Sequence, residues 1–193
     1  MVLSRGVNYL HPYTNPEVEK ANDLLHQANV IIQKTWLTQM VFTWRWWLLV
    51  TSAALAWVVW IKFRDKKSTD SLLYAGFFIM LATSFLDTIG MSLGLWSYSV
   101  KSVPLIPPFV TFDLCQIPIA NMLWIQIMPK LNPVIKSLIL ATVASFISQP
   151  VAVLVGTYNP KVWRHFYSFP IVAVLYLIAY SLYKRFQAEE GAK

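Results

Sequence analysis

The sequence predicts an all-α integral membrane protein, in which about five transmembrane helices form a bundle behind an N-terminal amphipathic helix. The first reason is composition, since 56% of the 193 residues are hydrophobic, 15% are aromatic and only 13% are charged. A soluble domain has about 25% charged residues, and a small one needs polar groups over a large surface. The second reason is that about five windows reach the roughly 20 mostly apolar residues that a membrane helix needs. We therefore exclude a disordered chain and an ordinary soluble enzyme.

Short loops separate the five windows and leave no room for a second domain. The third window is the weakest, because it carries polar side chains that include Asp113 and Gln116. We expect an external segment over residues 1–43, a transmembrane bundle over residues 44–185 and a cytoplasmic tail over residues 186–193. The windows run from about Trp44 to Ile61, Leu72 to Trp96, Pro108 to Met128, Ile135 to Val155 and Phe166 to Tyr183.

The segment from Pro16 to about Met40 has the periodicity of an amphipathic helix. Asn15 before Pro16 suits an N-cap followed by the first helical turn. We expect this helix to lie on the outer membrane surface. The alternative is that it packs on the outer loops of the same protein. Its apolar face consists of Val18, Ala21, Leu25, Ala28 and Ile32.

Positive charge gathers at the ends of the apolar windows. Lysine and arginine outnumber the acids 16 to 9, which gives a net charge of +7. In a soluble chain this would suggest nucleic acid, but at window ends it orients a membrane protein and contacts anionic lipid. We therefore predict a multi-pass cell-membrane protein with an external N-terminus and a cytoplasmic C-terminus, whose partner is the lipid bilayer and not nucleic acid. The cations on the cytoplasmic side are Lys62, Arg64, Lys66, Lys67, Lys130, Lys136, Lys184, Arg185 and Lys193.

Aromatic residues mark the expected external ends of the later windows. Trp and Tyr are enriched at membrane interfaces, where the ring is apolar and the N–H or O–H group stays wet. An interfacial belt is therefore the first interpretation, and a tryptophan-lined ligand cage is the second. The residues are Trp96, Tyr98, Tyr158 and Trp163.

Asp87 and Asp113 are the acids inside the apolar windows. An Asp at the centre of a membrane helix costs roughly 2.5–3.5 kcal/mol on insertion scales, so it normally faces protein, water or a partner. Both acids lie toward the external ends of antiparallel neighbouring windows, which puts their carboxyl groups at similar depth. We predict that they are the charged or proton-carrying groups of a polar pocket in the outer half of the bundle.

Further polar groups converge on the same outer half. Gln116 shares a helical face with Asp113, and Gln149 lies in the external half of the fourth window. We expect both glutamines to act as orienting hydrogen-bond partners. Arg164 and His165, at the start of the fifth window, are the candidate counter-charges.

Two glycines follow Asp87 on the same helical face. Gly90 and Gly94 form a G-x-x-x-G pattern, which lets another helix approach closely. The spacing predicts a helix-packing surface.

Prolines fall in the same zone as these polar groups. Pro118, Pro150 and Pro170 each remove one helical hydrogen bond and free a carbonyl four residues earlier. Freed carbonyls in a membrane need partners, which favours a small wet cavity or bonds from nearby glutamines.

Several classes of enzyme and transporter are excluded because their sequence motifs are absent. The chain has no P-loop, no dinucleotide-binding glycine pattern, no H-E-x-x-H and no C-x-x-C. One cysteine, Cys115, allows neither an intrachain disulfide nor a cysteine-based metal site. We predict no metal and no cofactor.

The acid pair predicts a protein that binds or transports a small molecule, an ion or a proton. One alternative is a scaffold that self-associates as a homo-oligomer, or holds a membrane partner, through Gly90 and Gly94. Another is a membrane-embedded lipid-modifying enzyme whose carboxyl groups divide into acid and base, although we favour a protein that is not an enzyme. A third is a structural network in which Asp87 or Asp113 pairs with Arg164 or His165 to fix helix register.

The stretch from Asp87 to Tyr98 has the pattern D-x-x-G-x-x-x-G-L-W-x-Y, and Asp113 with Pro118 follows it. With FTWRWWLLV before and YNPKVWRHFYSFP after, it resembles an uncharacterised family of small multi-spanning membrane proteins of endospore-forming Gram-positive bacteria. The resemblance covers roughly residues 42–182. It implies a membrane location and a multi-pass helical fold, and it implies no activity.

Overall fold

The computed structural model describes residues 15–104 and 109–191, and within them the fold is almost wholly helical. This confirms the predicted all-α bundle. The start of the third window at Pro108, residues 1–14 of the external segment and residues 192–193 of the tail lie outside the described residues. Among the described residues, four stretches are long and apolar enough to cross a membrane, namely Trp44–Phe63, Lys66–Ser92, Pro133–Val155 and His165–Glu189.

The bundle makes five passes, of which one is short. Helix α2 (Trp44–Phe63) leads through the single turn η2 (Lys66–Ser68) into α3 (Thr69–Ser92). The third pass consists of the wide π-turn η3 (Phe112–Gln116) and the helix α4 (Ile117–Gln126). These have 5 and 10 residues, and at a rise of 1.5 Å per residue they fall short of an apolar core about 30 Å thick. The expected third span is therefore a shorter, interrupted helix.

The fourth pass is also a helix that is interrupted by a π-turn. Helix α5 (Pro133–Val143) continues through the π-turn η4 (Ala144–Ser148) into α6 (Gln149–Val155), and α7 (His165–Gly191) makes the last pass. Pro118 and Pro150 each stand in the first turn of the helix that follows a π-turn. The wide turns thus lie where these prolines remove a helical donor, which is the place that the sequence indicated.

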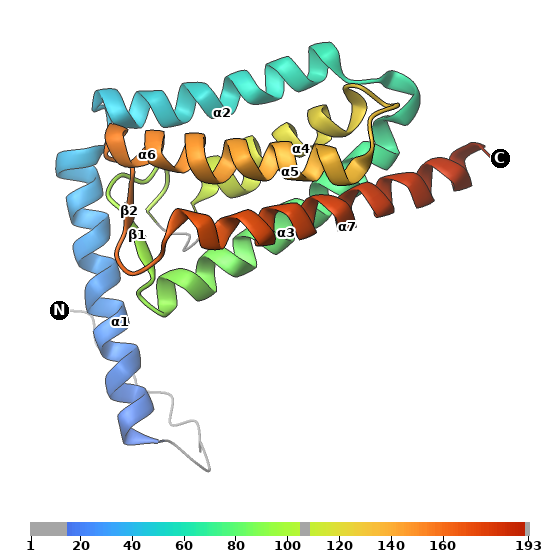
Figure 1. Ribbon diagram of the computed structural model, residues 1–193. Coiled ribbons are helices and arrows are strands. Elements are labelled where there is room, and N and C mark those ends of the chain that lie inside the picture. Colours follow the sequence, from blue (N-terminus) through green and yellow to red (C-terminus); the bar gives the residue numbers. More distant parts are fainter. Residues whose placement is uncertain (1–14, 105–108, 192–193) are drawn as a thin grey trace, which may run out of the picture.

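A two-stranded ladder closes one end of the bundle, which we call the ladder end. Strand β1 (Trp96–Tyr98) pairs antiparallel with β2 (Tyr158–Pro160), and Tyr98 lies opposite Tyr158. The ladder joins the connection after α3 to the connection after α6 (Figure 1). Strands at these positions were not predicted from the sequence.

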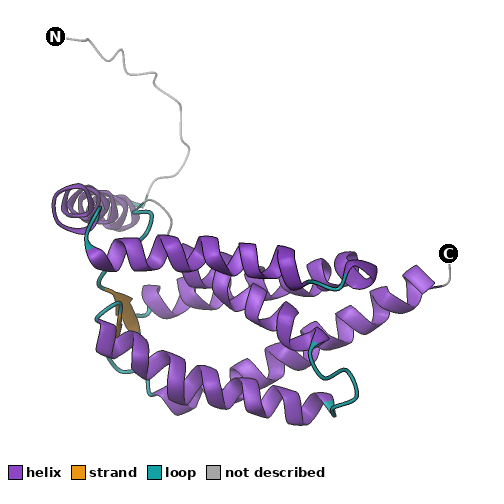
Figure 2. Cartoon of the chain, turned by 90° about the horizontal axis from the view of Figure 1, so that it is seen from above, coloured by secondary structure: helices purple, strands orange, loops and turns teal. Residues whose placement is uncertain are grey.

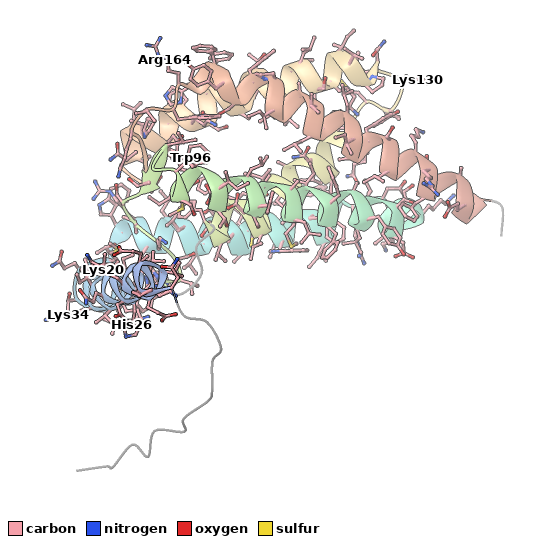
Figure 3. The ribbon with its side chains drawn as sticks, turned by 90° about the horizontal axis from the view of Figure 1, so that it is seen from below. Lys20, His26, Lys34, Trp96, Lys130 and Arg164 are labelled. Carbon is pink, nitrogen blue, oxygen red and sulfur yellow. The ribbon has the colours of Figure 1, made fainter. Side chains whose placement is uncertain are left out.

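The helices form two layers (Figures 2 and 3). One layer contains α2, α3 and α4, and the other contains α5, α6 and α7. Helix α3 packs against α4 and α7, and α5 packs against α7. The larger hydrophobic core lies between these helices and includes Trp60, Leu72, Ile79, Met122 and Tyr176.

The two layers are fastened at the end opposite the ladder, which we call the far end. Lys136 is 1% exposed there, and its Nζ donates to the carbonyls of Ile125 at 2.9 Å and Ile127 at 2.6 Å. Trp124 Nε1 donates to the Lys136 carbonyl at 2.9 Å. These bonds satisfy carbonyls that the end of α4 leaves free. Beyond this junction α5 and η4 pack on α7, and α4 packs on α2 and α3.

Helix α1 (Pro16–Thr35) runs crosswise to the spans at the ladder end (Figure 1). Asn15 caps it as predicted, because its side-chain oxygen accepts from the Glu17 N–H at 3.0 Å. No residue of α1 is buried, and Leu25 is 63% exposed. The alternative that this helix packs its apolar face on the outer loops is therefore wrong. The following π-turn η1 (Trp36–Met40) is attached, since Trp36 Nε1 donates to the Lys101 carbonyl at 2.9 Å.

Candidate functional site

Asp87 and Asp113 come together near the ladder end. Asp87 is on α3 and 5% exposed, and Asp113 is on η3 and 4% exposed. The backbone N–H of Phe109 donates to both carboxyl groups, at 3.1 Å to Asp87 Oδ2 and 3.0 Å to Asp113 Oδ2. This shared donor places the two carboxyl groups side by side. The structure thus brings together the pair that the sequence singled out.

Asp87 is held by donors from the connection between α3 and η3. Its Oδ1 accepts from Trp96 Nε1 at 2.7 Å and from the Tyr98 hydroxyl at 2.6 Å. With the Phe109 N–H, this gives the carboxyl group three donors. Donors to the charged form stabilise a buried carboxylate. Asp87 therefore has a positioning role, because it fixes β1 and the chain at Phe109 against α3.

Neither acid has the expected counter-charge. Among the described residues, no salt bridge reaches Asp87 or Asp113. Arg164 is exposed at the ladder end (Figure 3). His165 Nδ1 lies 3.1 Å from the Gln149 side-chain oxygen, so its partner is an amide and not a carboxylate. The prediction that Arg164 or His165 pairs with the acids is wrong, because neutral donors from the connection take that place.

The two glutamines bond to residues other than the acids. Gln116 Nε2 donates to the Ser52 hydroxyl of α2 at 2.7 Å. Gln149 Nε2 donates to the Ser168 hydroxyl at 2.8 Å, and Trp163 Nε1 donates to the same oxygen at 2.9 Å. The glutamines therefore tie α6 to α7 and η3 to α2, and they do not orient the carboxyl groups directly.

A cavity of about 510 Å³ lies between the two layers, and it is partly open. Asp87, Asp113, Gln116 and Gln149 all line it, although most of its wall is apolar. This volume and character are typical of small-molecule sites. The wall includes aromatic rings from both connections and from the start of η3, namely Trp96, Tyr98, Phe109, Phe112, Tyr158 and Trp163.

The aromatic residues that the sequence suggested as an interfacial belt form one wall of this cavity. Tyr98 stacks on Phe109 with ring centroids 4.2 Å apart, and Trp96 meets Trp163 edge-on at 5.0 Å. The sequence from Asp87 to Tyr98 was a signal for this aromatic wall beside the acid, because it contains the acid and two of its donors. What it did not show was that the chain folds back over α3.

Gly90 and Gly94 do not form a helix-packing surface. A Cβ added at Gly90 would overlap the six-membered ring of Trp96. Gly94 lies beyond the end of α3 with φ of +69°, where it serves a turn that favours glycine. Gly90 therefore makes room for Trp96 of the same chain, which corrects the interpretation of the G-x-x-x-G pattern.

The two tyrosines beside the acids stay uncharged at neutral pH. Burial, reinforced by Asp87, raises the pKa of Tyr158 to about 12 and raises the pKa of Tyr98 further. Both phenols therefore stay protonated at neutral pH. Partial burial lowers the pKa of Lys101, against the opposing effect of Asp87.

The cavity lining also contains polar residues that were not predicted from the sequence, and Asn121 is the one with an unpartnered polar atom. Asn121 lines the cavity and is 5% exposed. Its Nδ2 donates to the Ile117 carbonyl at 2.9 Å, while its side-chain oxygen is buried without a partner. Its position eight residues after Asp113, on the same helical face, was the available signal.

The described residues contain no group of three or more His, Cys, Asp or Glu side chains that could hold a metal ion. Comparison with protein-family models, curated proteins and solved structures gives no match. The fold and the cavity define the class, which is a helical bundle with an acidic, aromatic-walled cavity between its layers. Within the part of the chain that the structure describes, four of its helices are apolar enough to cross a membrane. The resemblance to the endospore-former family stays a prediction.

Proposed function

We propose that this chain is a multi-pass cell-membrane protein that binds or transports a small molecule or ion in the cavity between its layers. The observation that carries the proposal is the pair of buried acids at the wall of a mostly apolar cavity. A purely structural cluster requires no space beside it. A carboxyl pair next to about 510 Å³ of space favours a ligand.

The ladder end is external in this proposal, and the C-terminus is cytoplasmic. The far end carries η2 and Lys130, where the cations of the cytoplasmic side gather. The apolar side chains of α1 then lie in the outer membrane interface, crosswise to the spans.

Two exposed lysines at opposite ends test this orientation. In a Cys115→Ser background, we expect Lys161→Cys to react with a membrane-impermeant maleimide on intact cells. Lys130→Cys should react only after the cells are permeabilised, because Lys161 follows β2 and Lys130 lies at the far end. The reverse pattern of labelling would contradict the orientation and leave the cavity unaffected.

Filling the cavity tests the binding function. Ala120 lines the cavity and is exposed, so Ala120→Phe places a ring in the space without crowding the core. We expect aromatic fragments that bind the wild-type protein in nanodiscs to bind this variant at least about tenfold more weakly, a loss of about 1.4 kcal/mol. Ligand-observed NMR with neutral, cationic and anionic fragments gives the measurement.

Ala54→Phe is the matched control, because Ala54 is exposed on α2 and does not line the cavity. It should bind fragments as the wild type does. Equal binding by all three proteins would place the fragments outside the cavity and remove the support for this function.

The alternatives receive less support from the contacts. The scaffold hypothesis relied on Gly90, whose face is occupied by Trp96 of the same chain. The lipid-modifying enzyme needs carboxyl groups that are free to exchange roles, and Asp87 is held by three donors. Asp113 has a single described side-chain bond, and it is the acid that we assign to ligand contact.

A further inference from the structure

The lining of the cavity is electrostatically one-sided. Among the described residues that line it, two are acids and none is Lys, Arg or His. The titratable groups that face the acids are Tyr98 from β1 and Tyr158 from β2, which stay neutral, and Lys101 from the connection after β1. No titratable side chain from α5, η4, α6 or α7 lines the cavity. Such a wall attracts cations and repels anions.

The carboxyl pair also limits its own charge. The two groups share the Phe109 N–H, and both are at least 95% buried. No salt bridge reaches either acid among the described residues. Two adjacent carboxylates in a low dielectric repel strongly, so such pairs keep one proton between them. Asp87, with three donors, is the better placed to carry the charge, and the proton then belongs on Asp113.

The rest of the cavity wall suits both the cationic group and the apolar part of an organic cation. The rings of Trp96, Trp163 and Tyr158 line the cavity, and aromatic faces attract ammonium groups. Asn121, another residue of the lining, has a buried side-chain oxygen without a hydrogen-bond partner. The apolar residues that make up most of the lining would contact a hydrocarbon body.

We propose that the cavity takes an organic monocation with an apolar body, whose cationic group sits beside Asp113 and displaces the proton that Asp113 shares with Asp87. This inference rests on the proposed function and names the class of its ligand. The exchange balances, since one cation enters and one proton leaves. The acid pair changes from one negative charge to two, and the bound cation restores the net charge of the site.

Benzyltrimethylammonium and its neutral isostere neopentylbenzene test the inference, because they differ in charge and hardly in shape. We expect the wild-type protein in nanodiscs to bind the cation at least about tenfold more tightly than the isostere. Calorimetry in buffers of different ionisation enthalpy should show about one proton released per cation bound. The affinity should then rise about tenfold per pH unit while the pair holds its proton.

Asp113→Asn removes the exchangeable proton and keeps the shape of the side chain. We expect this variant to lose the proton release and the pH dependence, and to bind the cation at least about tenfold more weakly. Asp70→Asn is the control, because Asp70 is an exposed acid in the first turn of α3 at the far end. It should behave as the wild type does in both measurements.

Equal affinity for the cation and the isostere would overturn the inference, as would cation binding without proton release. Absence of binding by the cation would also overturn it. These results are distinct from failure of the proposed function, because neutral or anionic fragments that Ala120→Phe displaces would still identify the cavity as a ligand site. The comparison of the two probes uses the wild-type protein alone, so it holds even where Asp113→Asn folds poorly.

Discussion

Asp87→Ala is expected to lower the free energy of unfolding by roughly 3 kcal/mol or more, because it leaves three buried or part-buried donors without their acceptor. The donors are Trp96 Nε1, the Tyr98 hydroxyl and the Phe109 N–H. For a chain of this size, 3 kcal/mol corresponds to roughly 6–12 °C in the thermal midpoint. Thermal unfolding in nanodiscs, followed by near-ultraviolet circular dichroism, measures the loss.

Asp113→Asn is the matched comparison, because Asp113 accepts one described side-chain bond. We expect its stability to stay within about 1 kcal/mol of the wild type, since an amide oxygen can accept from the Phe109 N–H as well. The two acids then separate into a positioning residue and a ligand-contacting residue. Equal destabilisation by Asp87→Ala and Asp113→Asn would mean that the pair is a single structural network.

Gly90→Ala is expected to destabilise the protein by about 1–3 kcal/mol, which is typical of overpacking. The added methyl group overlaps the Trp96 ring, so the indole must leave its position. Its movement breaks the bond of 2.7 Å to Asp87 and the edge contact with Trp163. The cavity loses part of its aromatic wall, and fragment binding should weaken with stability.

A double-mutant cycle isolates this contact. The overlapped atoms belong to the six-membered ring of Trp96, which a phenylalanine at this position does not place at the same site. Gly90→Ala should therefore cost far less in a Trp96→Phe background than alone. Costs that simply add would show that Gly90 faces something other than Trp96, such as a helix of a second chain.

Composition and periodicity predict the class of fold and the acids of the site. The apolar windows are long enough to indicate spans directly, and an acid within such a window is costly enough to indicate a polar environment. Pro118 and Pro150 likewise indicate the interruptions that appear as η3 and η4. These signals work because membrane helices are constrained by their own length and by local backbone chemistry.

The partners of the acids could not be predicted in the same way. Trp96 and Tyr98 reach Asp87 because β1 pairs with β2, about 60 residues later in the chain, and a connection has no periodicity that reports such pairing. The counter-charge was assigned by charge alone, whereas neutral N–H and O–H donors satisfied the acid. A glycine pattern shows that something approaches closely and does not show which group approaches.

The junction at Lys136 has a consequence for how a ligand arrives. The bonds of Lys136 join α4 to α5 at the far end, and the ladder joins the two connections at the ladder end. We therefore expect the partly open cavity to open between α4 and α5. A molecule reaching it would first dissolve among the acyl chains. Its apparent affinity measured from water therefore contains its partition coefficient into the bilayer, and each added methylene should strengthen it by about 0.8 kcal/mol before any contact with the protein forms.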